Sequence, residues 1–149
     1  MKKATDIMNS EVVTVTPTTT IKELAQIFSF HQISGVPVVD ESGTLVSVVT
    51  ESDLIDQTKK VHIPTVVTIL DSVFYLENPD KMEKEMKKIA GYRVGDICSE
   101  RLITVEKDTP LDEIATIMAE ENVHTLPVMD DNKLVGVIGK KDIIRTLIN

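Results

Sequence analysis

The chain is poor in cysteine, in aromatic residues and in long apolar runs. Cys98 is the single cysteine among 149 residues, and there is no tryptophan, with two tyrosines and three phenylalanines. One cysteine excludes an intrachain disulfide and fits a reducing compartment. No apolar run approaches the roughly 20 residues needed to cross a bilayer, and polar Thr5 and Asp6 stand where a secretory signal would be apolar. We therefore expect a cytoplasmic protein with no membrane association.

Basic residues are also scarce relative to acidic ones. Lysine and arginine number 16 against 24 aspartate and glutamate residues, which gives a formal net charge of −8. An acidic chain with few aromatic side chains is poorly suited to follow a phosphate backbone or to stack on bases. We expect no binding to nucleic acid.

Recognisable catalytic and metal-binding patterns are lacking as well. The three histidines, His31, His62 and His124, are too scattered for metal-ligand spacing. Residues 136–141 hint at a phosphate-binding loop, but the glycine spacing is short and no Ser or Thr follows the lysine. No nucleophile, base and orienting group can be assembled. We predict no catalytic residues, no metal site and no enzymatic activity.

The chain does contain an internal duplication. Several positions recur 90 residues later, and after a one-residue deletion in a turn the spacing becomes 89, which places Leu45 opposite Leu134 and Asp53 opposite Asp142. The positions at the longer spacing are Asp6 and Asp96, Thr14 and Thr104, and Pro37 and Pro127. A fixed-period match of this kind defines the structural unit of the fold.

Each unit is predicted to run strand, helix, strand, strand, helix. The first strand of unit one is expected over Val12–Val15, and a short helical lead-in over residues 3–10. Apolar residues at i, i+3, i+4 and i+7 predict the first helix of each unit. They are Ile21, Leu24, Ala25 and Phe28 in one unit and Leu111, Ile114, Ala115 and Met118 in the other. A Thr20–Glu23 capping box should open the first of these helices, and Thr109 followed by Pro110 at the first helical position should open the second.

These units predict an α+β fold made of two tandem β-α-β-β-α repeats with pseudo-twofold symmetry. Repeat one covers residues 1–59 and repeat two residues 94–149, and they can share a core. The inter-repeat insertion, residues 60–93, should carry a helix near residues 79–90, which either rests on the core or moves and reports on a ligand. Within residues 61–77, residues 66–70 fit either a strand or part of a buried helix, because periodicity alone does not distinguish them.

The duplicated pattern resembles a known family. Residues 35–40, Gly-Val-Pro-Val-Val-Asp, followed by Thr50-x-x-Asp53-Leu54 and repeated in tandem, resemble a CBS-domain pair, or Bateman module. The resemblance implies a regulatory module that binds an adenosine-containing ligand in the cleft between its repeats and forms a homodimer. AMP, ADP, ATP or S-adenosylmethionine are the implied ligands, none of them a required cofactor, and the regulated protein is unknown.

The resemblance also implies the binding residues. Thr50 and Asp53 match ribose-binding positions, Asp142 is the second ribose carboxylate, and His124 would face phosphates. Apart from the resemblance, Lys140 and Lys141 stand at the start of the last helix, against its dipole, where an arriving phosphate would make their charge favourable. Each cleft is completed by the other repeat, and its apolar members would sandwich an adenine. This places Ile103, Val123 and His124 near Asp53, and Val13, Val36 and Pro37 near Asp142.

Several of these residues also have purely structural interpretations. Thr50 and Asp53 fit a capping box that needs no ligand, Lys140 and Lys141 fit two ordinary surface lysines, and His124 fits a structural histidine. Because Gly139 replaces the hydroxyl of Thr50, we expect Asp53 to be the better site and Asp142 the weaker or empty one. The alternative to a sensor is a ligand-free dimerisation scaffold.

Overall fold

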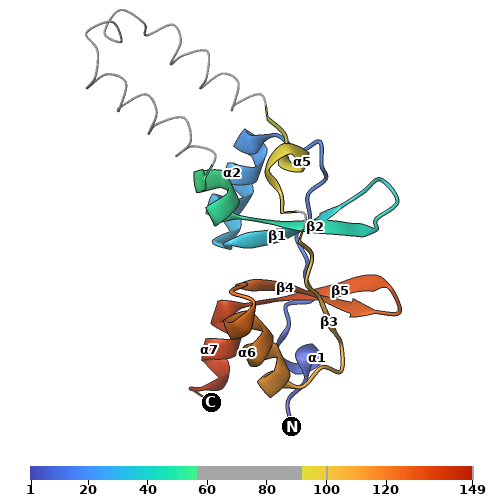
Figure 1. The fold of residues 1–149 in the computed structure, drawn as a ribbon, viewed down its shortest axis with the longest axis vertical. Helices are drawn as coiled ribbons and strands as arrows, with labels where there is room; N and C mark the ends of the chain where they lie inside the picture. The colour runs from blue at the N-terminus through green and yellow to red at the C-terminus, as the bar shows by residue number, and fades with distance from the viewer. Residues whose placement is uncertain (57–91, 100, 149) are drawn as a thin grey trace, which may run out of the picture.

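A computed structural model describes residues 1–56, 92–99 and 101–148 (Figure 1). The helix predicted near residues 79–90 and the segment 61–77 lie outside the described residues. Within them, two small sheets face each other across the middle of the molecule. Helices α2 and α5 cover the outer side of one sheet, and α1, α6 and α7 cover the outer side of the other.

The two halves contain the predicted elements in the predicted order. Repeat one has α2 (Ile21–His31), β1 (Gly35–Val39) and β2 (Leu45–Thr50), followed by helical residues 51–56. Repeat two has β3 (Val105–Glu106), α6 (Leu111–Glu120), β4 (Thr125–Asp130), β5 (Lys133–Gly139) and α7 (Lys140–Thr146). Each hairpin is antiparallel, with Gly35 opposite Thr50 and Thr125 opposite Gly139. The predicted α+β fold of two tandem repeats is confirmed.

The first strand of repeat one is shorter than the sequence indicates. Instead of a strand over Val12–Val15, only Val15 pairs with its neighbour, through a parallel bridge to Val38. The Val15 amide donates to the Pro37 carbonyl at 3.1 Å, and the Val39 amide donates to Val15 at 2.8 Å. The prediction was wrong for the preceding residues, because Val12 and Val13 line a cavity rather than the sheet.

Local capping explains where the first helices of the repeats begin. At α2, the Thr20 hydroxyl accepts from the Glu23 amide at 3.1 Å and the Glu23 carboxylate accepts from the Thr20 amide at 3.2 Å, so the predicted capping box is confirmed. At α6 the predicted cap was wrong by one residue. Pro110 itself is the N-cap, and the Thr109 hydroxyl instead accepts from the Glu106 amide at 3.0 Å.

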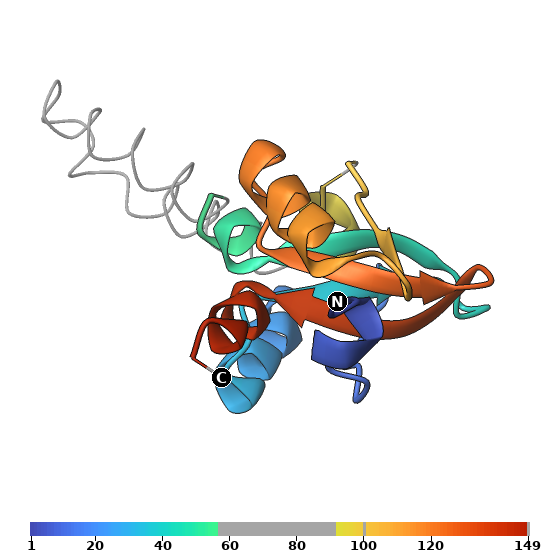
Figure 2. The same ribbon diagram turned by 90° about the horizontal axis from the view of Figure 1, so that it is seen from below.

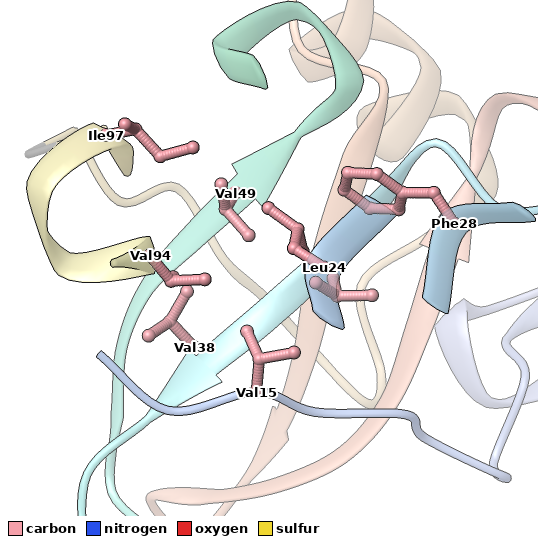
Figure 3. Close-up of a cluster of buried hydrophobic side chains, with 8 residues drawn as sticks. Val15, Leu24, Phe28, Val38, Val49, Val94 and Ile97 are labelled. Atoms are coloured by element: carbon pink, nitrogen blue, oxygen red, sulfur yellow. The ribbon is translucent and has the colours of Figure 1, made fainter. Parts of the chain in front are cut away.

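Each hydrophobic core is completed by the other repeat. The first core contains Leu24, Val38 and Val49 of repeat one, and Figure 3 shows Val94 and Ile97 of α5 (Val94–Ile97) among them. Conversely, Ala4 of α1 (Ala4–Ile7) is fully buried in the second core. Backbone hydrogen bonds fix each short helix to the other repeat. The Ala4 amide donates to the Thr109 carbonyl and the Val94 amide to the Thr19 carbonyl, both at 2.9 Å.

The two sheets come into close contact near the pseudo-twofold axis. Gly35 and Thr125 are equivalent residues of the two repeats, and both are buried. A β-carbon placed on Gly35 would lie 2.4 Å from the Thr125 hydroxyl oxygen and 2.9 Å from its β-carbon. The repeats therefore pack this closely because glycine occupies one of the two positions.

Candidate functional site

The larger of the two cavities described here lies between the repeats, beside Asp142. It measures about 1180 Å³. Repeat two contributes His124, Gly139 and the first turns of α7, while repeat one contributes Val13, the end of α2 and the start of β1. Figure 1 shows α2 and α7 on different sheets, and Figure 2 shows both helices on the same side of the molecule. The cavity is therefore a cleft formed jointly by both repeats.

Asp142 presents a carboxylate with acceptor capacity to spare. One oxygen, Oδ2, accepts from the Gly139 amide at 2.7 Å, and the other lies 3.4 Å from Nη1 of Arg145. Gly139 has no hydroxyl that could donate a second hydrogen bond to Oδ2. A carboxylate offers about four lone-pair sites, so Asp142 can still accept hydrogen bonds from hydroxyl groups in the cleft.

Cationic side chains gather next to this carboxylate. Lys140, Lys141 and Arg145 all line the cleft from α7. The Lys141 ammonium donates to the backbone carbonyl of Gln32, at the end of α2, at 3.4 Å. This contact bridges the two repeats across the cleft, and it leaves the charge of Lys141 without an acidic partner among the described residues.

The ten predicted site residues fall into three groups. Five of them line the Asp142 cleft, namely Val13, Pro37, His124, Lys141 and Asp142. Of those five, His124 also accepts a backbone hydrogen bond from the Lys140 amide at 3.1 Å. Val36 lies instead in the first core with no exposed surface, so its side chain contacts only protein.

The other four residues were expected around Asp53, the position in repeat one that is equivalent to Asp142. Asp53 Oδ2 accepts from the Thr50 amide at 2.9 Å and from the Thr50 hydroxyl at 3.1 Å, while the Thr50 hydroxyl also accepts from the Asp53 amide at 3.3 Å. Ile103 and Val123 pack against the second core. None of the four lines either described cavity. The cavity geometry thus favours Asp142, although the sequence led us to expect Asp53.

The sequence analysis did not commit to several cleft residues. Lys140, Arg145 and His31 line the cavity, as does Gln32, whose left-handed backbone ends α2. A signal for the cations was present, because the internal alignment pairs Arg145 with an aspartate and Lys140 with a glutamate. For His31 and Gln32, no feature of the sequence of repeat one indicated a place in the cleft.

The arrangement suits a small polar ligand that carries both hydroxyl groups and negative charge. Asp142 offers hydrogen-bond acceptors, the α7 side chains offer cationic donors, and Val13 and Pro37 offer apolar surface. In the described part of the chain, no three His, Cys, Asp or Glu residues converge on a possible metal position. Nor does any helix there have the length and apolar character that crossing a membrane requires.

Comparisons with known proteins agree with this architecture. Residues 4–60 and 94–149 each match the family model for the CBS domain. CBSX1, a chloroplastic CBS domain-containing protein of Arabidopsis thaliana, is 34% identical over 140 residues, covering 88% of this chain and 57% of CBSX1. The uncharacterized protein MJ1426 of Methanocaldococcus jannaschii is 29% identical over 152 residues, covering 96% of this chain and 89% of that protein.

Two solved structures extend the comparison. CBSX2 in complex with AMP has a TM-score of 0.73 at 24% identity, covering 99% of this chain and 97% of that one. The CBS domain pair of MJ0100, solved with 5′-methylthioadenosine and S-adenosyl-L-methionine, has a TM-score of 0.73 at 25% identity, covering 99% and 96%. The fold is therefore shared along nearly the whole of each chain.

Proposed function

The chain belongs to the CBS-domain family as a tandem pair of repeats, and from that premise we propose that it is a regulatory module that binds an adenosine-containing ligand in the Asp142 cleft. The observation that carries the proposal is the cavity of about 1180 Å³ that both repeats line. A ligand that contacts both walls stabilises one relative arrangement of the repeats, which is how binding is transmitted to a partner.

The chemistry of the cleft supports an adenosine ligand. An ionised carboxylate can accept from both neighbouring hydroxyls of a ribose, and Asp142 has free acceptor sites. Val13 and Pro37 supply apolar surface for the adenine, and Lys141 and His124 supply donors for a phosphate. AMP and S-adenosyl-L-methionine are the ligands of the related CBSX2 and MJ0100 structures.

The ligand acts as a signal in this proposal, and the module itself performs no catalysis. Thr50, Asp53, Ile103 and Val123 are assigned to a second, weaker cleft, which would take a ligand only after Asp53 gives up its capping contacts. The regulated partner and the cytoplasmic setting stay predictions.

A homodimer is part of the proposal. Three large apolar side chains on α2 and at the end of α7 are strongly exposed, with Phe30 at 83%, Leu147 at 82% and Ile148 at 79%. We assign these side chains to the contact between the two copies of the chain, since contiguous exposed apolar surface marks such contacts. A ligand-free scaffold would use the same surface, so dimerisation alone does not distinguish the two functions.

A thermal-shift panel of AMP, ADP, ATP and S-adenosylmethionine tests the proposal. A ligand present at 100 times its dissociation constant stabilises the folded state by about 2.7 kcal/mol, which is a shift of about 5–10 °C for a chain of this size. We expect Asp142→Asn to abolish the shift, since the amide can still accept from the Gly139 amide but no longer carries the charge.

Asp53→Asn is the matched control, because it alters the equivalent carboxylate of the other repeat. We expect it to lower the melting temperature through its weakened cap while leaving the ligand-induced shift intact. If none of the four ligands shifts the unmodified protein, the scaffold function replaces the sensor.

A further inference from the structure

We propose that the Asp142 cleft selects adenosine ligands that carry several negative charges, a di- or triphosphate, over uncharged or cationic adenosyl compounds. The equivalent cleft at Asp53 does not take such ligands. This inference rests on the proposed function and specifies which ligands the site accepts. It comes from a difference in charge between the two repeats.

Equivalent positions along the last helix of each repeat differ in charge. In repeat two these positions carry three positive charges, and in repeat one they carry two negative charges and a serine. The equivalent pairs are Lys140 and Glu51, Lys141 and Ser52, and Arg145 and Asp56. In a chain with a net charge of −8, three cations that face one cavity form a local exception.

The cations of the Asp142 cleft are available to a ligand. Both lysines are exposed, and neither takes part in an ion pair between described residues. Lys141 contacts only a neutral carbonyl, that of Gln32. An exposed ion pair contributes little by itself, but a phosphate chain that reaches several donors at once makes charge-assisted hydrogen bonds to each.

The cleft also contains three carboxylates, and their placement decides where the ligand charge can lie. The negative charge of Asp142 is balanced by the Arg145 guanidinium, whose Nη1 lies 3.4 Å from Oδ1. Glu11 and Glu51 line the cavity from elements other than α7, so they disfavour an anion that lies away from the α7 lysines. Ligand phosphates are therefore directed towards Lys140 and Lys141, and the ribose towards Asp142.

Neither described cavity is lined by Asp53. The residues of repeat two that correspond to Glu11 and His31 are Arg101 and Glu121. The Arg101 guanidinium donates to the Glu121 carbonyl at 3.3 Å and also pairs with the Glu121 carboxylate. No bond or ion pair joins Glu11 to His31, although both residues are described. Arg101 is thus already neutralised by Glu121, and the last helix of repeat one has no cation in place of Lys140, Lys141 and Arg145.

Calorimetric titration with adenosine, AMP and ATP tests the selection. We expect affinity to rise from adenosine to ATP by about tenfold or more, the equivalent of at least one charge-assisted hydrogen bond, and the rise to shrink at high salt. The double variant Lys140→Glu, Lys141→Ser gives repeat two the residues of repeat one. It should reduce the affinity ratio of ATP to adenosine, and Arg145 is then the only cation of α7 left in the cleft.

Lys133→Ser is the matched control, because Lys133 is an exposed lysine of the same repeat that does not line the cavity. It should preserve the affinity ratio of ATP to adenosine. If adenosine binds as tightly as ATP, or if the double variant keeps the ratio, the charge selection is overturned while the proposed function stands. If no adenosine compound binds, the proposed function fails, and the selection fails with it.

Discussion

Replacing Gly35 by alanine is expected to destabilise the contact between the repeats. The new β-carbon would lie 2.4 Å from the Thr125 hydroxyl oxygen and 2.9 Å from its β-carbon. Rotating the Thr125 side chain moves the hydroxyl but not the β-carbon, so the backbones of β1 and β4 must separate. Overpacking in a well-packed interior typically costs about 1–3 kcal/mol. For a chain of this size that loss corresponds to a fall in melting temperature of about 2–12 °C.

A double-mutant cycle tests whether this particular contact is responsible. Thr125→Gly removes the atoms that collide, so Gly35→Ala should cost much less in that background, with a coupling energy above about 1 kcal/mol in urea unfolding. Gly139→Thr is the control, since a β-carbon there meets nothing closer than 3.7 Å and Thr50 occupies the equivalent position. The reasoning is refuted if the two substitutions at the axis have additive effects, or if Gly139→Thr is as destabilising as Gly35→Ala.

Three further predictions concern single contacts. Hydrogen bonds, first that from the Ser42 hydroxyl, hold the pKa of Asp40 below its usual 3.8. The folded state is therefore favoured above that pH and loses this contribution as the pH falls below it, so Asp40→Asn should flatten the acid limb of a stability profile. Ser47→Ala removes a donor to the Ser99 carbonyl and should cost about 1 kcal/mol in urea unfolding. Val94→Ala should cost about 2 kcal/mol by the same measurement, within a single unfolding transition, because Val94 is buried in the core of the other repeat.

The fold could be predicted from the sequence because each helix and strand occurs in both repeats, so its pattern could be recognised twice. The turn between the strands is the only place where the repeats differ in length, so the register of Leu45 and Leu134 was available from the sequence alone. The apolar periodicity that begins at Ile21 and Leu111 likewise gave the correct helices. Local patterns sufficed here because each depends on neighbours within one turn or one strand.

The exchange of lead-in helices could not be predicted in the same way. Ala4 and Val94 each lie at the start of their own repeat in the sequence, and nothing local indicates that each packs in the other core. The partner is decided by tertiary contacts such as the hydrogen bond from Val94 to Thr19. For the same reason, the sequence did not reveal that residues before Val15 leave the sheet to line the cleft.

The sequence analysis expected the ligand to prefer Asp53, because Thr50 supplies a hydroxyl beside it. The structure favours Asp142, because that hydroxyl has the opposite effect on the carboxylate. A hydroxyl beside the carboxylate was taken as an additional ribose contact. At Asp53 that hydroxyl, from Thr50, donates to the carboxylate itself and strengthens a cap. At Asp142, the Gly139 amide donates a hydrogen bond but there is no hydroxyl to donate a second one. The Asp142 carboxylate can therefore still accept from a ligand, and α7 is capped less well.

This difference links binding to stability, since a weakly capped helix with three cations gains more from an anionic ligand than a well-capped one does. Gly139→Thr should therefore stabilise the free protein by a few tenths of a kcal/mol and weaken its affinity for ATP. Thermal unfolding with and without ATP measures both effects. A variant that gains stability and also binds ATP more tightly would contradict the argument.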